Sequence, residues 1–198
     1  YHLTVAGNVT QDYQLSVLGN LNITGTLNSN GYNLYLAGNF NNSGTYTSGA
    51  NSVYLIGNHQ SITGSNSFNN LIKRNNTSAS LTFPAGSTQT ISGTLELDGT
   101  AGDLLVLKSS TSGSTWTINH TGSLKYLSYL NVSDSVSVST LDAKSNSTNS
   151  GNNTNWVFTS TNALVWTGAV NTNFSDAGNW AGSVAPTVND IVEFLSGS

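Results

Sequence analysis

The stretch "NLYLAGNF" at residues 33–40 decides the fold, because the same phrase returns along the first part of the chain. The other copies read "LTVAGNV" from Leu3, "LSVLGNL" from Leu15 and "VYLIGNH" from Val53. Successive phrases are separated by 12, 19 and 19 residues, measured between their glycines Gly7, Gly19, Gly38 and Gly57. A period of 19 is too short for helical repeats, which take about 33 residues or more, and suits one coil of a β-solenoid.

A second phrase moves with the first, 6, 6 and 7 residues after the glycines at 19, 38 and 57. It reads Thr24-Gly25-Thr26, Ser43-Gly44-Thr45 and Thr63-Gly64-Ser65, and it returns as Ser92-Gly93-Thr94. Between these landmarks the apolar residues alternate with a period of 2, as in Leu15/Val17, Leu34/Leu36 and Val53/Leu55. Such alternation predicts short strands with one face turned inward.

The Gly-Asn pair is expected to form the corner that ends each strand, since Gly tolerates positive φ and Asn tolerates the left-handed region. Equivalent residues of a solenoid stack about 4.8 Å apart. Asn20, Asn39 and Asn58 are therefore either an amide ladder or simple turn residues. Tyr35 and Tyr54, 19 residues apart, are predicted to stack as an outward aromatic ladder.

These patterns predict an all-β fold, a right-handed parallel β-helix with coils of about 19 residues over residues 1–160. Residues 161–198 are predicted to form a small C-terminal β module that caps the helix or connects it to another. Helix is a poor alternative, because β-branched, aromatic, Asn and Gly residues dominate and form helices weakly.

The composition argues against several classes of partner. Only 7% of the residues are charged, the net charge is −4, and five residues are Lys or Arg. Nucleic acid and anionic membranes need clustered basic residues, so neither is expected as a partner. The only basic pair, Lys73-Arg74, is expected in a solvated turn. No apolar run approaches the roughly 20 residues that span a bilayer, so membrane insertion is not expected either.

No catalytic or metal-binding pattern emerges from the residues. Asp98 and Asp103 flank the loop "DGTAGD", which is either a calcium site or a plain acidic turn. His2, His59 and His120 lie at no ligand spacing and are expected to be solvated at turns. The chain has no Cys for disulfides or thiolate ligands. We therefore predict no catalytic residue, no metal, no cofactor and no enzymatic activity.

Two segments carry a resemblance to known proteins. Residues 81–158, which end in "SGNNTNWVF", look like repeats of very large secreted bacterial surface proteins that are adhesin-like. Residues 164–194 resemble the W-x-G…NW…G-x-x-P…D-x-V motif of autotransporter- and filamentous-haemagglutinin-like passenger repeats. The resemblance implies an extracellular or cell-surface location and a structural or adhesive role, and it implies no catalytic residues.

The two ends of the chain suggest head-to-tail assembly of copies. A coil phrase begins at Leu3 with no visible cap, and the apolar strand "DIVEFLS" occupies residues 190–196. The module of one copy is therefore predicted to pack on the first coil of the next by strand addition, either between subunits or along one tandem chain. The residues expected in this contact are Leu3, Val5, Trp166, Trp180, Ile191, Val192 and Phe194.

Two other functions stay open. A carbohydrate-binding or carbohydrate-active β-helix would take surface glycans as partners, with Trp166, Phe174 and Trp180 as a sugar platform; the competing role for these rings is a cap. An ice-binding solenoid would use the hydroxyl groups of the second phrase, although its Ser and Thr alternate and its register soon drifts.

Overall fold

A computed structural model describes residues 1–144, 146–158, 164–180, 183, 185–186 and 192–193. The chain divides into two compact units, Tyr1–Phe158 and Thr159–Ser198. This division falls two residues before the boundary expected from the sequence. Among the described residues, no helix is long and apolar enough to cross a membrane.

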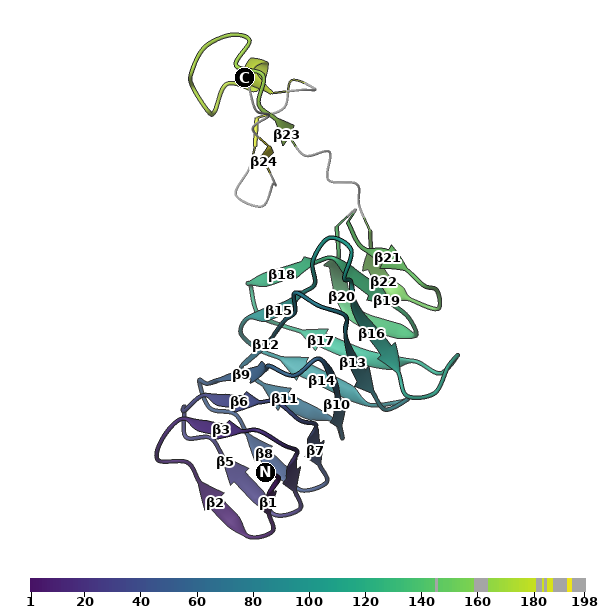
Figure 1. Cartoon of the computed structure of the whole chain (residues 1–198). Helices are drawn as coiled ribbons and strands as arrows, with labels where there is room; N and C mark the ends of the chain where they lie inside the picture. Colours follow the sequence, from purple (N-terminus) through teal and green to yellow (C-terminus); the bar gives the residue numbers. More distant parts are fainter. Residues whose placement is uncertain (145, 159–163, 181–182, 184, 187–191, 194–198) are drawn as a thin grey trace. The chain divides into compact units, whose positions relative to one another are not determined.

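The first unit is built from parallel strands that stack into sheets on three faces, an arrangement consistent with a β-helix (Figure 1). Successive strands move from face to face, and from β1 to β17 each strand that pairs onward does so with the strand three places further along the chain. The prediction of an all-β fold with parallel pairing is thereby confirmed.

The first face is one eight-stranded sheet: β1 (Leu3–Val5), β4 (Leu21–Ile23), β7 (Phe40–Asn42), β10 (His59–Thr63), β13 (Ala79–Phe83), β16 (Leu105–Ser109), β19 (Leu130–Val132) and β21 (Thr148–Asn149). The second face has six strands: β3 (Leu15–Val17), β6 (Leu34–Leu36), β9 (Ser52–Leu55), β12 (Asn70–Arg74), β15 (Leu95–Asp98) and β18 (Lys125–Ser128). The third face holds two sheets, β2 (Asn8–Thr10), β5 (Thr26–Asn28) and β8 (Thr45–Thr47), then β11 (Asn66–Phe68), β14 (Thr88–Ile91), β17 (Trp116–His120), β20 (Ser135–Asp142) and β22 (Thr154–Val157).

The register on the second face follows the repeated phrase. Leu15 pairs with Leu34 and Leu34 with Val53, so each partner lies one period of the phrase further along the chain. The alternate residues Leu36 and Leu55 are buried in the core, as the period of 2 predicts. The phrase at Leu3 is an exception, because Leu3 pairs with Leu21 and not with a residue of the second face. "LTVAGNV" is therefore equivalent to "LNITGTL", which explains its odd spacing from the next copy.

The corner glycines are needed for a different reason from the one expected. Neither Gly19, Gly38 nor Gly57 has a positive φ. A Cβ atom on Gly38 would lie 2.3 Å from the carbonyl carbon of Gly19, and one on Gly57 would lie 2.0 Å from the oxygen of Ala37. The positive-φ explanation was wrong, and close approach of the preceding coil excludes a side chain at these corners.

The coils lengthen in the middle of the first unit and shorten again toward its end. On the second face Leu71 pairs with Leu95 and Leu95 with Lys125, and each of these steps is longer than the period of the phrase. On the first face Val132 pairs with Asn149, which is a shorter step. The extra residues form loops between strands, so the periodic phrases lose their register after residue 67 while the stack continues.

Side chains of the first and third faces pack around the break between the two sheets of the third face. Asn42 donates to Asn66 (2.8 Å), and Asn66 donates to the side chain of Gln89 (3.0 Å). Phe40 and Phe68 pack beside this break, with ring centroids 5.4 Å apart. Tyr46 of β8 and Phe68 of β11 also pack against each other, with ring centroids 5.9 Å apart, so packed rings continue the stack where β8 and β11 are not paired.

The second unit is small. Its described strands β23 (Leu164–Val165) and β24 (Val192–Glu193) pair in parallel. A 3-10 helix, η1 (Ala177–Asn179), begins after Asp176, whose side chain accepts a hydrogen bond from the N–H of Gly178.

Candidate interaction surfaces

Asparagine side chains bond between coils at the corner predicted for them, but in a different pattern. The Oδ1 atom of Asn20 accepts from the backbone N–H of Asn39 (2.9 Å), and the Oδ1 atom of Asn39 accepts from the N–H of Ser61 (2.9 Å). His2 opens this series, since its Nδ1 atom accepts from the N–H of Asn20 (2.8 Å). Asn58 is displaced from the series, because the step along the chain between the paired strands β7 and β10 is longer than the period of the phrase. The bonds therefore join side chain to backbone rather than amide to amide.

An outward column of side chains runs along the second face. Tyr35 and Tyr54 stack with ring centroids 4.5 Å apart and planes 6° apart, as predicted. Register continues this column to Ile72, Glu96 and Tyr126. A stripe that begins aromatic thus becomes charged in the middle of the unit.

Some hydroxyl groups of the repeated Ser/Thr-Gly-Ser/Thr phrase form hydrogen bonds with the backbone. Thr24, Ser43 and Ser92 each donate a long hydrogen bond to a carbonyl of the preceding coil, at 3.3–3.4 Å. Thr26 and Thr45, the second hydroxyl residues of the first two phrases, pair in register. The use of half the hydroxyl groups by the backbone weighs against a regular ice-binding array.

Lys73 lies inside the solenoid, and the prediction of a solvated turn at Lys73-Arg74 was wrong. Both residues belong to β12, where the period of 2 directs Lys73 inward with Leu71 and Arg74 outward. The Lys73 ammonium donates to the carbonyl of Gly57 (2.5 Å) and to the side chain of Gln60 (2.9 Å). Burial lowers the pKa of Lys73 to about 8.

The histidines separate into two environments. His2 and His59 are exposed, as expected. His120 is buried in β17, where its Nε2 atom lies 2.9 Å from the carbonyl oxygen of Gly93, so the prediction of a solvated turn was wrong for this residue. No group of three or more His, Cys, Asp or Glu residues that could hold a metal occurs within the described part of the chain.

Arg74, Glu96 and Asp98 meet on the outward side of the second face. Arg74 forms a two-pronged ion pair with Glu96, and this carboxylate raises the pKa of Arg74. Asp98 accepts a hydrogen bond from Ser128. Glu96 and Asp98 are two residues apart in β15, so they share one face.

A hollow of about 380 Å³ opens beside this cluster. We call it the Arg74 hollow; it is lined by Arg74, Asn75, Asn76, Asp98, Gly99 and Thr100. The backbones of Thr100 and Asp103 exchange two hydrogen bonds, at 3.0 and 3.1 Å, across the loop "DGTAGD". Sequence reasoning singled out this loop, but it missed Arg74, which is brought here by pairing between coils.

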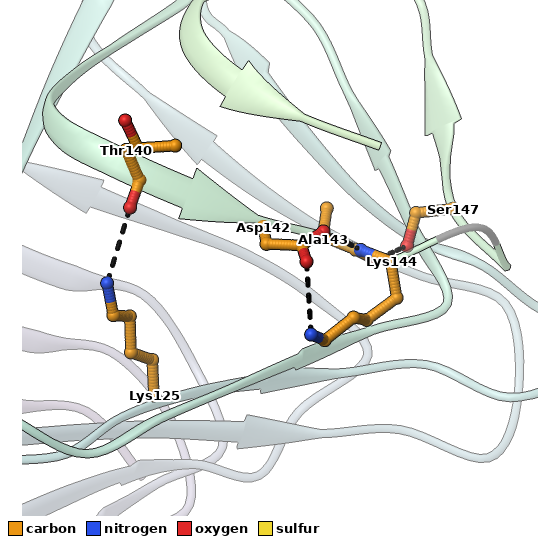
Figure 2. A network of polar contacts seen from close by, with 6 residues as sticks. All are labelled: Lys125, Thr140, Asp142, Ala143, Lys144 and Ser147. Carbon is orange, nitrogen blue, oxygen red and sulfur yellow. Dashed lines mark hydrogen bonds and ion pairs between the residues drawn. The ribbon is translucent and has the colours of Figure 1, made fainter. Parts of the chain in front are cut away.

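A second charged group lies at the end of β20 (Figure 2). Lys144 donates to both carboxylate oxygens of Asp142, through its backbone N–H (2.9 Å) and its ammonium group (3.0 Å). Lys125 donates to the carbonyl of Thr140 (3.3 Å), and Ser147 donates to that of Ala143. These contacts hold the backbone turn at Lys144, whose φ is +66°.

The N-terminal end of the first unit exposes strand edges and apolar side chains. Among the described strands, β1, β2 and β3 each pair on one side only. A hollow of about 430 Å³ lies at this end. Its apolar lining consists of Leu3, Val5, Val9, Tyr13, Leu15 and Leu27. Two residues expected in the inter-subunit contact, Leu3 and Val5, therefore line this hollow.

The tryptophans of the W-x-G…NW motif form the core of the second unit. The buried ring of Trp180 lies edge-on to Trp166 and to Phe174, with centroids 5.1 and 4.8 Å away. Gly168 is the glycine of W-x-G; it has a φ of +60°, and an added Cβ would lie 3.2 Å from Trp166 Nε1. The motif residues thus have a structural role within their own unit.

Asn179 of the same motif is fully buried and organises the loop before it. Its Oδ1 atom accepts from the N–H groups of Val170 and Asn171, both at 2.9 Å. Its Nδ2 atom donates to Asn171 and to the carbonyl of Asn173, again at 2.9 Å. Val192 lies in β24, whereas Ile191 and Phe194, also expected in the inter-subunit contact, lie outside the described residues.

Comparisons with protein families, with characterised proteins and with solved structures found nothing that matches this chain. The resemblance to bacterial surface repeats rests on the quoted residues alone. What the geometry offers is a stacked scaffold with three surfaces of interest: the N-terminal end, the outward column of the second face and the Arg74 hollow.

Proposed function

We propose that this protein is an extracellular structural or adhesive solenoid, right-handed and with its basic coil length set by the repeated phrase, whose copies join head to tail. The observation that carries the proposal is the N-terminal end. Three strands of three different faces present unpaired edges there, around an apolar hollow. Strand edges of this kind are templates for further strands.

Gly7 supports the same proposal. Its equivalents in the next coils, Gly25 and Gly44, are glycines because a Cβ would lie 2.3 and 2.1 Å from a carbonyl oxygen of the coil before. No atom lies within 4 Å of the corresponding position on Gly7. A glycine at this corner is explained if another coil stacks on it.

The surface chemistry is suited to a rod outside the cell. A weakly charged surface of Asn, Ser, Thr and Gly does not favour nucleic acid or anionic membranes. The absence of Cys makes the fold independent of the redox state of its surroundings. The resemblance to secreted surface repeats points the same way.

Electron microscopy and sedimentation velocity of the purified full chain test the proposal. We expect particles that lengthen along one axis as the concentration rises, since a head-to-tail contact does not close on itself. A monomer at every concentration, or a closed dimer, would contradict head-to-tail joining.

A further inference from the structure

The Arg74 hollow lies on a sheet face and not at an edge. Its strand β12 is paired with β9 on one side and with β15 on the other. A peptide that binds by strand addition needs a free edge, and none is available here. A ligand at this place meets side chains only.

Two charged side chains of the hollow, Arg74 and Asp98, already have hydrogen-bond partners. Arg74 is held by both oxygens of Glu96, and Asp98 is held by the hydroxyl of Ser128. The loop from Gly99 to Asp103 supplies Gly99 and Thr100 to the lining and is closed by the two backbone hydrogen bonds between Thr100 and Asp103. A site whose groups are already placed loses little entropy on binding.

The lining offers hydrogen-bonding groups of every kind. It presents a guanidinium group, two carboxamides, a carboxylate and a hydroxyl. The hollow, of about 380 Å³, is wide open to solvent, so a ligand there keeps part of its surface in water.

Two tyrosines share the outward column of Glu96, the ion-pair partner of Arg74. Tyr126, 56% exposed, is paired with Glu96, and Tyr54 lies two strands before Glu96 in the same outward column. Rings of this kind offer flat apolar area together with a polar hydroxyl. Guanidinium, carboxylate and carboxamide groups can bond pairs of hydroxyl groups, and aromatic rings can pack against C–H groups. Together they suit a ligand that has hydroxyl groups at its rim and C–H groups on its faces.

The charged groups at the hollow determine whether it favours a neutral or an anionic ligand. Arg74 forms an ion pair with Glu96 and lies beside Asp98 in the paired strand, so two carboxylates share one cation in this cluster. The whole chain carries −4. An anionic ligand would be repelled, so a neutral one is favoured.

We propose that the Arg74 hollow binds a neutral oligosaccharide, with Arg74 and Asp98 bonding adjacent sugar hydroxyls and Tyr54 and Tyr126 flanking the chain. The inference rests on the proposed adhesive function, because it names the ligand for it. It assigns binding and no reaction: both oxygens of Glu96 are engaged by Arg74.

An array of neutral and acidic oligosaccharides, followed by calorimetric titration of the full chain with the best neutral binder, tests the proposal. Arg74→Ala and Asp98→Ala should each raise Kd by about tenfold or more. The matched controls are Lys108→Ala and Asp12→Ala, which remove the same charges at exposed positions outside the hollow. They should change Kd by less than about twofold.

Three outcomes would overturn the assignment: no neutral oligosaccharide binds at about 10 mM, only acidic ones bind, or binding survives both variants. A further variant, Asn76→Trp, fills the hollow from an exposed position and should also abolish binding. Microscopy of the same samples separates the two proposals. Rods that bind no glycan would refute the oligosaccharide site and leave head-to-tail assembly supported. A permanent monomer that binds glycan would refute head-to-tail assembly and leave the oligosaccharide site supported.

Discussion

Lys73 places an ammonium group in the interior of the stack, and this sets a pH dependence of stability. Burial lowers its pKa from the ordinary 10.5 to about 8 in the folded chain. Between these values the unfolded chain holds the proton more tightly than the folded one, so the free energy of unfolding rises with pH. The full shift corresponds to roughly 3 kcal/mol.

We therefore expect the wild type to gain about 2 kcal/mol of stability between pH 8 and pH 10. Lys73→Met should lose this gain, whereas Lys108→Met, at an exposed position, should keep it. Urea unfolding at several pH values measures the effect. The series should stop at pH 10, because burial raises the pKa of Tyr46 and ionisation of this tyrosine in the unfolded chain lowers stability above that pH. An unchanged slope in Lys73→Met would refute the assignment.

The corner glycines give a second prediction at this scale. Gly38→Ala would place a methyl group against the backbone of Gly19, so we expect a loss of about 1–3 kcal/mol or more. Gly7→Ala has open space and should change monomer stability by less than about 0.5 kcal/mol. Thermal melting at a concentration too low for assembly compares the two, and equal effects would contradict a steric role for the corner.

The strands of the second face depend on one inward column, in which Val17, Leu36 and Leu55 pair in register. Leu36→Ala removes a fully buried side chain, and we expect a loss of about 2–5 kcal/mol. Ile56→Ala, at a position 51% exposed, is the matched control and should cost much less. Chemical denaturation measures both, and a small loss for Leu36→Ala would mean that the column is not the core.

The sequence was sufficient to predict these strands because short coils repeat the same positions. The period of the phrase and the alternation of Leu34 and Leu36 mark both the coil and its inward face. The position of each corner glycine was also predictable, but its cause was not. Steric contact between coils is a property of the stack and leaves no local signal.

The candidate site was harder to predict. Pairing of β12 with β15 places Arg74 beside Asp98, although the two residues lie in different coils and the step between them is longer than the period of the phrase. Lys73 and Gln60 were missed as interior residues for a related reason. Extra residues displace Asn58 where β7 and β10 pair, and the Lys73 amine bonds the carbonyl of Gly57 there.

At the scale of the whole molecule, assembly should depend on the C-terminal residues as well as on the first coil. Deleting residues 190–198 removes the apolar segment that is predicted to join the next copy. We expect the first unit to keep its melting temperature and its β-sheet circular dichroism, while end-to-end growth is lost. Filaments formed by the shortened chain would show that this segment is not the connector.

The first coil provides the sharper test, because two changes there leave the monomer intact and alter only what can stack on it. Gly7→Ala adds a methyl group where a docked coil would bring its carbonyl, as the contacts of Gly25 and Gly44 with the coils before them indicate. Val9→Lys puts a charge at the rim of the apolar hollow, at a residue 44% exposed.

Both variants should melt like the wild type yet sediment as monomers, since a docked coil would have to desolvate the new charge or overlap the new methyl group. Val138→Lys, at a residue 59% exposed on β20, is the matched control and should still assemble. If all three variants form rods, the contact between copies lies elsewhere. If Gly7→Ala alone forms rods, the docked strands pair at the edges without the close corner approach seen between the coils of one chain.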